Sequence, residues 1–150
     1  MSDTPRSRPE RRRDAEQRLT QDIELRVATA SADGGPYLVP LSFDWDGEAV
    51  LMATSAGSPT GRNLAAAGVV RLALGETRDV YLVDGRVTVL PIDALPAEQG
   101  DRFAARTGFD PRTLTTPYNW FRVIPDRIQA WRNEAEIPGR DVLRDGRWLA

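Results

Sequence analysis

Hydrophobic and polar residues alternate over much of this sequence, with the two-residue period of β-strands that bury one face. The clearest example spans residues 37–45, where one face carries the hydrophobic side chains Tyr37, Val39, Leu41, Phe43 and Trp45. Turn signals bound this segment, with Asp33-Gly34-Gly35 before it and Asp46-Gly47 after it. Asp-Gly pairs between alternating segments are typical of β-hairpins. The pattern therefore predicts three consecutive antiparallel strands, at residues 26–31, 37–45 and 49–54.

The remainder of the chain repeats the strand pattern and adds a few short helices. Further strands are predicted at residues 69–74, 80–83, 86–90, 118–124 and 127–132, with Asp84-Gly85 as the turn of another hairpin. Helices are predicted from Pro59 to about Ala67, ended by Gly68, from about residue 95 to residue 107, and from about residue 9 to residue 22. Many short strands joined by tight turns predict a mainly β fold with short helices. The architecture we expect is a six- or seven-stranded antiparallel barrel with its helices outside.

Three residue types are missing, and their absence limits the chemistry of the side chains. The 150 residues include no Cys, no His and no Lys, so all 20 basic residues are Arg. Catalytic groups that need His or Cys, ordinary zinc sites and lysine Schiff bases are therefore excluded. We predict no metal site, and if the protein is an enzyme, a bound cofactor supplies the chemistry. With no disulfide framework, no hydrophobic leader and no apolar stretch of membrane-spanning length, we expect a cytoplasmic protein that does not bind membranes.

Positive charge is concentrated at the start of the chain. Residues 1–13 hold five Arg against Asp3 and Glu10, whereas residues 14–150 carry a net charge of −5. We interpret residues 1–13 as a flexible Arg-rich arm and residues 14–150 as one domain. Such an arm suits a solvated tail, an anionic ligand or nucleic acid. Nucleic acid is the least favoured partner, because the body is acidic and lacks interleaved basic and aromatic residues.

The junction between residues 53 and 63 is the best local candidate for a binding site. Ser58 followed by Pro59 is typical of a helix start, where free amides and the helix dipole attract an anion. Donor side chains surround this start, namely Thr54, Ser58, Thr60, Arg62 and Asn63. They suit the oxygens of a phosphate, while the alternative interpretation is ordinary helix capping with a surface arginine.

Two further segments offer candidate ligand contacts. Trp131 shares a strand face with Arg127 and Gln129, which suits a subunit interface, a planar ligand or the rim of the core. Arg78 and Asp79 open a predicted strand, where a charged pair either belongs to a turn or points across the mouth of the barrel toward a ligand.

The order of these motifs resembles the pyridoxamine 5'-phosphate oxidase-like proteins, especially their actinobacterial branch. The resemblance covers about residues 22–149 and is most specific between Thr54 and Gly75. The segments that carry it are 27–30, 33–41, 45–47, 53–54, 58–64, 68–75, 77–80, 109–112, 129–132 and 144–148.

This resemblance implies a Greek-key split barrel of the FMN-binding type. It also implies a homodimer, with FMN or a deazaflavin coenzyme at the subunit interface. The residues that would hold the phosphate are Thr54, Ser58, Thr60, Arg62 and Asn63. The residues that would contact the ring are Val39, Pro40, Leu41, Ser42 and Ala53, together with Trp131 near the C-terminus. We include Arg78 and Asp79 among the predicted cofactor contacts.

The sequence departs from the family's oxidase, which uses Lys beside the phosphate and an Arg/His motif for its substrate. Since this chain has neither Lys nor His, vitamin B6 oxidation is not expected. We predict an FMN-binding oxidoreductase acting on an unidentified small conjugated substrate, with protons from water, Tyr or a carboxylate. A deazaflavin-dependent reductase is one alternative, because the Arg6–Arg13 arm can attract the anionic tail of that coenzyme. A non-catalytic flavin carrier or sensor is the other.

Overall fold

The computed structural model describes residues 4–150, whose secondary structure is mainly β. The strands are β1 (Glu24–Ala30), β2 (Pro36–Trp45), β3 (Val50–Ser55), β4 (Val69–Leu74), β5 (Val80–Pro91), β6 (Tyr118–Trp131), β7 (Asp141–Arg144) and β8 (Arg147–Trp148). The helices are α1 (Arg8–Gln21), α2 (Pro59–Ala67) and α3 (Ala97–Thr107), with short 3-10 helices η1 (Pro111–Thr113) and η2 (Glu134–Gly139).

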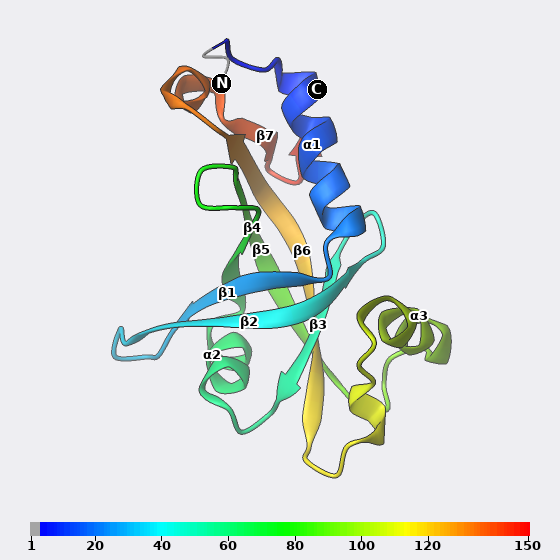
Figure 1. Cartoon of the computed structure of the whole chain (residues 1–150). Coiled ribbons are helices and arrows are strands. Elements are labelled where there is room, and N and C mark those ends of the chain that lie inside the picture. The colour runs from blue at the N-terminus through cyan, green and yellow to red at the C-terminus, as the bar shows by residue number, and fades with distance from the viewer. Residues whose placement is uncertain (1–3) are drawn as a thin grey trace.

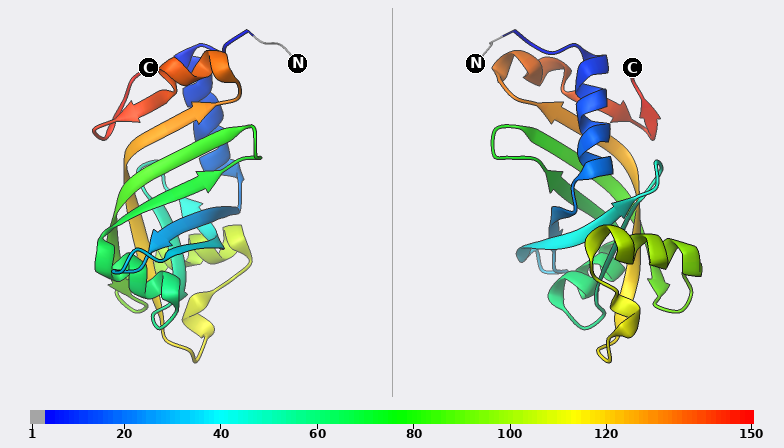
Figure 2. Two further views of the ribbon diagram at one scale, coloured as in Figure 1. Left: turned by 90° about the vertical axis from the view of Figure 1, so that its left-hand side faces the viewer. Right: turned by 45° about the vertical axis from the view of Figure 1, so that its right-hand side comes forward.

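The strands form a closed antiparallel barrel. Their order is β3-β2-β1-β4-β5-β6-β7-β8, and an additional pairing of β3 with β6 closes the first six into a ring. β7 and β8 continue the sheet outside that ring, while the helices lie around the barrel (Figures 1 and 2). The expected mainly β split barrel with outer helices is confirmed. In this closed barrel, β2 and β3 pair with each other over only part of their length.

The core has two parts, divided by β3 and β6. The larger part fills the barrel and includes Phe43, Met52 and Phe121, all fully buried. The smaller part lies under α3, where Phe103 meets Trp120 edge to face with ring centroids 5.1 Å apart. The buried segment of β3 supplies side chains to both parts, as expected for a strand that is apolar on both faces.

Two predicted breaks in the strands are wrong. Asp84-Gly85 is not a hairpin turn, because β5 runs unbroken through it from Val80 to Pro91. β6 likewise continues through Pro125 and Asp126. Gly85 instead lies at an irregularity in the β5–β6 register, where one extra residue bends the strands.

Gly85 is expected to tolerate no side chain. A Cβ atom there would lie 2.6 Å from the Ile124 carbonyl oxygen and 2.6 Å from Val123 Cγ1, so β6 would have to shift. We expect Gly85→Ala to lower the free energy of unfolding by about 1–3 kcal/mol, the usual cost of overpacking. Urea denaturation measures this, with Gly57→Ala as the control because a Cβ at Gly57 meets nothing within 4 Å. Equal stability of the two variants would contradict the close approach.

The predicted helices form close to the expected bounds. Gly68 and Gly108 end α2 and α3 in the left-handed conformation. α1 begins at Arg8 with a capping box between Ser7 and Glu10, so the boundary expected after residue 13 falls inside this helix. Residues 1–3 of the predicted arm lie outside the described residues. Within residues 4–150, none of the helices has the length and hydrophobicity needed to cross a bilayer.

Candidate functional site

A groove of about 210 Å³ opens on the barrel where β2 and β3 separate. β2 pairs with β3 only from Phe43 to Trp45. Before that point, β2 pairs with β1 alone, and beyond Met52 the end of β3 pairs with β6. The strands therefore diverge because each has a different neighbour, and the space between them is the groove.

Five of the predicted site residues meet in this groove, although they come from two strands. The residues that line it are Glu24, Pro40, Leu41, Ser42, Ala53, Thr54, Phe109 and Tyr118. Val39, also predicted as a ring contact, packs against the barrel core instead. Residues of both β2 and β3 thus line the groove.

Three lining residues were not predicted as site residues. Phe109 and Tyr118 bring two aromatic rings together, with centroids 6.0 Å apart and a tilt of 55°. Glu24, at the start of β1, adds a carboxylate. Within residues 4–150 neither this carboxylate nor the Tyr118 hydroxyl has a hydrogen-bond or ion-pair partner. The groove lining contains no basic residue. Its open polar groups are a carboxylate, a phenol and hydroxyls, which can accept hydrogen bonds or exchange protons with a ligand.

The start of α2 adjoins the groove through the chain segment that follows Thr54. Ser58 caps the helix as predicted, because its Oγ accepts a hydrogen bond from the Gly61 amide at 3.0 Å. The same hydroxyl donates to the Ser55 carbonyl oxygen at 2.8 Å. A Cβ at Gly61 would lie 2.2 Å from that carbonyl oxygen, so only glycine lets the helix start approach the end of β3 so closely.

The other predicted phosphate contacts are partly engaged within the protein. Thr60 is buried, and Asn63 Nδ2 donates to Thr29 Oγ1 at 3.1 Å. The exposed Arg62 side chain folds back and donates to the Gly57 carbonyl oxygen. The remaining Arg62 guanidinium donors stay available to an anion at the helix start.

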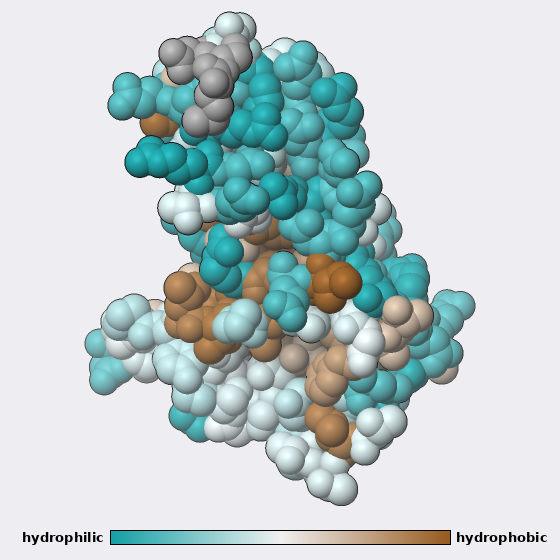
Figure 3. Space-filling view, viewed as in Figure 1, coloured by the Kyte–Doolittle hydropathy of each residue, from teal (hydrophilic) through white to brown (hydrophobic). Residues whose placement is uncertain are grey.

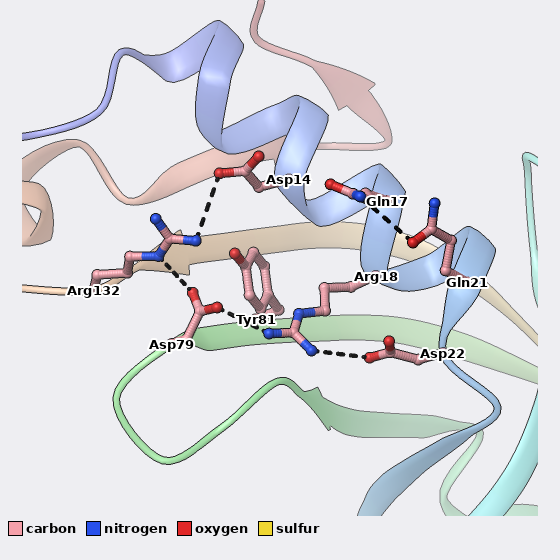
Figure 4. Close-up of a pocket in the computed structure, with 8 residues that line it drawn as sticks. All are labelled: Asp14, Gln17, Arg18, Gln21, Asp22, Asp79, Tyr81 and Arg132. Carbon is pink, nitrogen blue, oxygen red and sulfur yellow. Dashed lines mark hydrogen bonds and ion pairs between the residues drawn. The ribbon is translucent and has the colours of Figure 1, made fainter.

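The remaining predicted contacts lie elsewhere in the protomer. Asp79 accepts hydrogen bonds from Arg18 and Arg132, each at 3.0 Å, in a second hollow of about 270 Å³ between α1 and β5 (Figure 4). Burial alone would raise the pKa of Asp79, but bonds from Arg132, Tyr81 and Arg18 outweigh burial and lower it. Arg78 is exposed. The hydrogen bonds that Asp79 accepts fix α1 to the sheet.

Trp131 is also distant from the groove. Its indole ring lies 5.5 Å from the Arg140 guanidinium, at the end of β6 opposite to Tyr118. At about 3.3 Å per residue, the 14-residue strand separates these two ends by roughly 40 Å along its path. One protomer therefore does not bring Trp131, Arg78 and Asp79 to the groove.

Comparison with known proteins agrees with this architecture. A family model described as pyridoxamine 5'-phosphate oxidase matches residues 13–132. Among curated proteins, no sequence match is found.

Several solved structures are similar in fold. An F420 reductase shares 20% sequence identity with a TM-score of 0.62, covering 75% of this chain and 94% of the other. The heme storage protein HutZ from Vibrio cholerae shares 20% identity with a TM-score of 0.59, covering 82% and 93% of the two chains. General stress protein 26 from Bacillus anthracis strain Sterne shares 17% identity with a TM-score of 0.58, covering 81% and 94%. At these identities the likeness concerns the fold alone.

Proposed function

Since this chain belongs to the pyridoxamine 5'-phosphate oxidase family, we propose that it is an FMN-binding oxidoreductase acting on a small conjugated substrate. The groove between β2 and β3 carries the proposal. It brings Pro40, Leu41 and Ser42 together with Ala53 and Thr54, all of which the family resemblance implies as cofactor contacts. A groove lined by two strands and two aromatic rings suits a planar heterocycle.

The residues at the start of α2 fit the phosphate end of the cofactor. The exposed Arg62 guanidinium offers donors at the positive end of the helix dipole. Bound flavin would supply hydride and electron transfer. The protein's part is to orient the ring, and Glu24 and Tyr118 are the lining groups able to hold or move a proton beside it.

We propose that the working unit is a homodimer. Trp131, Arg78 and Asp79 can contact a ligand in the groove only if a second copy supplies them. An apolar surface for such a contact lies across the outer face of the sheet, where Leu38 and Val69 are 64% and 60% exposed. Figure 3 shows apolar surface over the region of β1 and β2 between more hydrophilic ends. Exposed apolar area of this kind is typical of subunit contacts.

A deazaflavin coenzyme is the alternative cofactor, supported by the similarity in fold to an F420 reductase. Its ring system is also planar and would use the same groove. The heme named for HutZ is less well supported, because the sequence contains neither His nor Cys, the common axial ligands of heme iron.

Titration of the purified protein tests the cofactor directly. FMN and the deazaflavin coenzyme are added separately while cofactor fluorescence is followed, and sedimentation of the same samples gives the subunit number. We expect saturable binding of FMN by a dimer. If neither cofactor binds with micromolar affinity, the proposal is wrong. Anaerobic reduction followed by a screen of quinones and conjugated carbonyls then separates an enzyme from a flavin carrier.

Arg62→Ala is expected to weaken FMN binding by about 1.5–3 kcal/mol, the contribution of a charge-assisted hydrogen bond. The same titration measures the change. Arg86→Ala is the matched control, because Arg86 is also exposed and its ion pair with Asp126 joins β5 to β6, outside the groove lining. An unchanged dissociation constant in Arg62→Ala would place the phosphate elsewhere.

A further inference from the structure

Four arginines surround a hollow at the end of the molecule opposite to α2. It has a volume of about 310 Å³, and its lining includes Arg8, Arg127, Arg140 and Arg144. Arg8 begins α1, Arg127 lies on β6, Arg140 precedes β7 and Arg144 is the last residue of β7. The start of α1 and η2 lie side by side at this end, far from α2 (Figures 1 and 2).

Among residues 4–150, Asp141 is the one carboxylate in the lining. It is buried and accepts hydrogen bonds from Arg127 Nε at 2.9 Å, Arg144 Nη2 at 2.8 Å and Gln129 Nε2 at 3.1 Å. Burial would raise the pKa of Asp141, but the bonds from Arg144, Arg127 and Gln129 lower it, so the group is ionised at neutral pH. Its single negative charge leaves three of the four positive charges uncompensated.

The uncompensated charge resides mainly on Arg8 and Arg140. Neither has a carboxylate partner within residues 4–150. Arg8 Nε is buried with no hydrogen-bond partner among those residues, which is costly for a charged donor. Arg140 Nη1 donates only to the Ile137 carbonyl oxygen, at 3.2 Å. Two of the four arginines in the lining therefore have no carboxylate partner among these residues.

We propose that this hollow binds an oxyanion group carrying two or more negative charges, such as a phosphate ester or a cluster of carboxylates. Guanidinium groups bind both kinds of anion through paired, charge-assisted hydrogen bonds. The hollow is large enough for a diphosphate or a few carboxylates, and a multiply charged anion would compensate the excess positive charge. Within one protomer this hollow and the start of α2 lie at opposite ends of the molecule (Figures 1 and 2).

Isothermal titration with pyrophosphate and with triglutamate, each at low ionic strength, tests this site. Pyrophosphate also suits the start of α2, so the titrations use the full chain carrying Arg62→Gln. We expect saturable binding of at least one probe with a dissociation constant below about 1 mM. Tighter binding of pyrophosphate identifies a phosphate site, and tighter binding of triglutamate identifies a carboxylate site.

Adding Arg8→Gln and Arg140→Gln together is expected to weaken binding roughly tenfold or more. Adding Arg86→Gln, which removes an exposed arginine outside the lining of the hollow, should weaken binding less than the Arg8 and Arg140 changes do. Arg140→Gln alone, on an exposed 3-10 helix end, guards against misfolding of the double variant and should weaken binding in the same direction. Absence of binding in the Arg62→Gln protein, or equal losses from Arg86→Gln and the Arg8/Arg140 changes, would overturn the proposal.

Discussion

Glu136→Gln is expected to lower the free energy of unfolding by about 3–5 kcal/mol at pH 7, the usual cost of breaking a buried ion pair. The Glu136 side chain is 1% exposed. It accepts three hydrogen bonds from Arg6, from the backbone amide at 2.7 Å, Nε at 2.9 Å and Nη2 at 2.8 Å. A fourth comes from the Arg132 amide at 2.7 Å. The variant would leave the Arg6 charge half-paired and the amides with a weaker acceptor.

The same residue predicts how stability changes with acid. Burial would raise the pKa of Glu136, but the bonds from Arg6 and from the Arg6 and Arg132 amides outweigh it and hold the pKa at about 2. Because the folded pKa lies below the usual 4.5, the stabilisation is complete above pH 4.5 and is lost as the pH falls toward 2. Urea denaturation between pH 7 and pH 2.5 measures it. The Glu48→Gln variant, changed at an exposed position, should keep this pH dependence of the free energy of unfolding. The Glu136→Gln variant should lose the part of it that Glu136 contributes. Identical pH dependence in the two variants would contradict the low pKa of Glu136.

The contacts of Glu136 also change the interpretation of the N-terminal arginines. Arg6 reaches Glu136 and Asp14, Arg11 donates to the Gly139 carbonyl oxygen, and Arg12 stacks on Trp148 with its guanidinium 4.6 Å from the ring. These side chains fasten α1 to the end of the barrel. The arm therefore serves the fold as well as any ligand, and Arg8 is the arm residue left to face the basic hollow.

Local signals were sufficient for the first hairpins and the helices. Asp46-Gly47 is a turn and Ser58 a helix cap because the residues that decide them are neighbours in sequence. Asp84-Gly85 has the same two residue types but forms no turn, since its flanking residues pair with β4 and β6 rather than with each other. The capping box of Ser7 and Glu10 was readable from the sequence and would have placed the start of α1 correctly.

The candidate site was predictable only where it is local. The backbone segments 40–42 and 53–54 could be assigned by resemblance, but Glu24, Phe109 and Tyr118 meet them only because β3 closes onto β6. The basic hollow is still harder to foresee. Arg127 and Arg144 become neighbours through the pairing of β6 with β7, and no local period in the sequence indicates that pairing.

Ser42→Trp is expected to weaken FMN binding roughly 1000-fold, or about 4 kcal/mol. Ser42 lies on the wall of the groove, on the β2 face opposite Leu41 and Phe43. An indole there would occupy much of the 210 Å³ and exclude the ring. Burial of a large aromatic surface, roughly 150–250 Å² at about 25 cal/mol per Å², contributes about 4–6 kcal/mol. The contacts at the start of α2 would remain, so weak binding through the phosphate should persist.

Fluorescence titration of FMN measures this loss, and Thr88→Trp is the matched control because it adds the same side chain at an exposed position of β5. Combining Ser42→Trp with Arg62→Ala should remove the residual affinity, since the two changes act on opposite ends of one ligand. Because the groove and the start of α2 lie four residues apart, between Thr54 and Ser58, a ligand that spans both should respond to each change. Full affinity in Ser42→Trp would show that the ring lies outside this groove, even if Arg62→Ala still weakens binding.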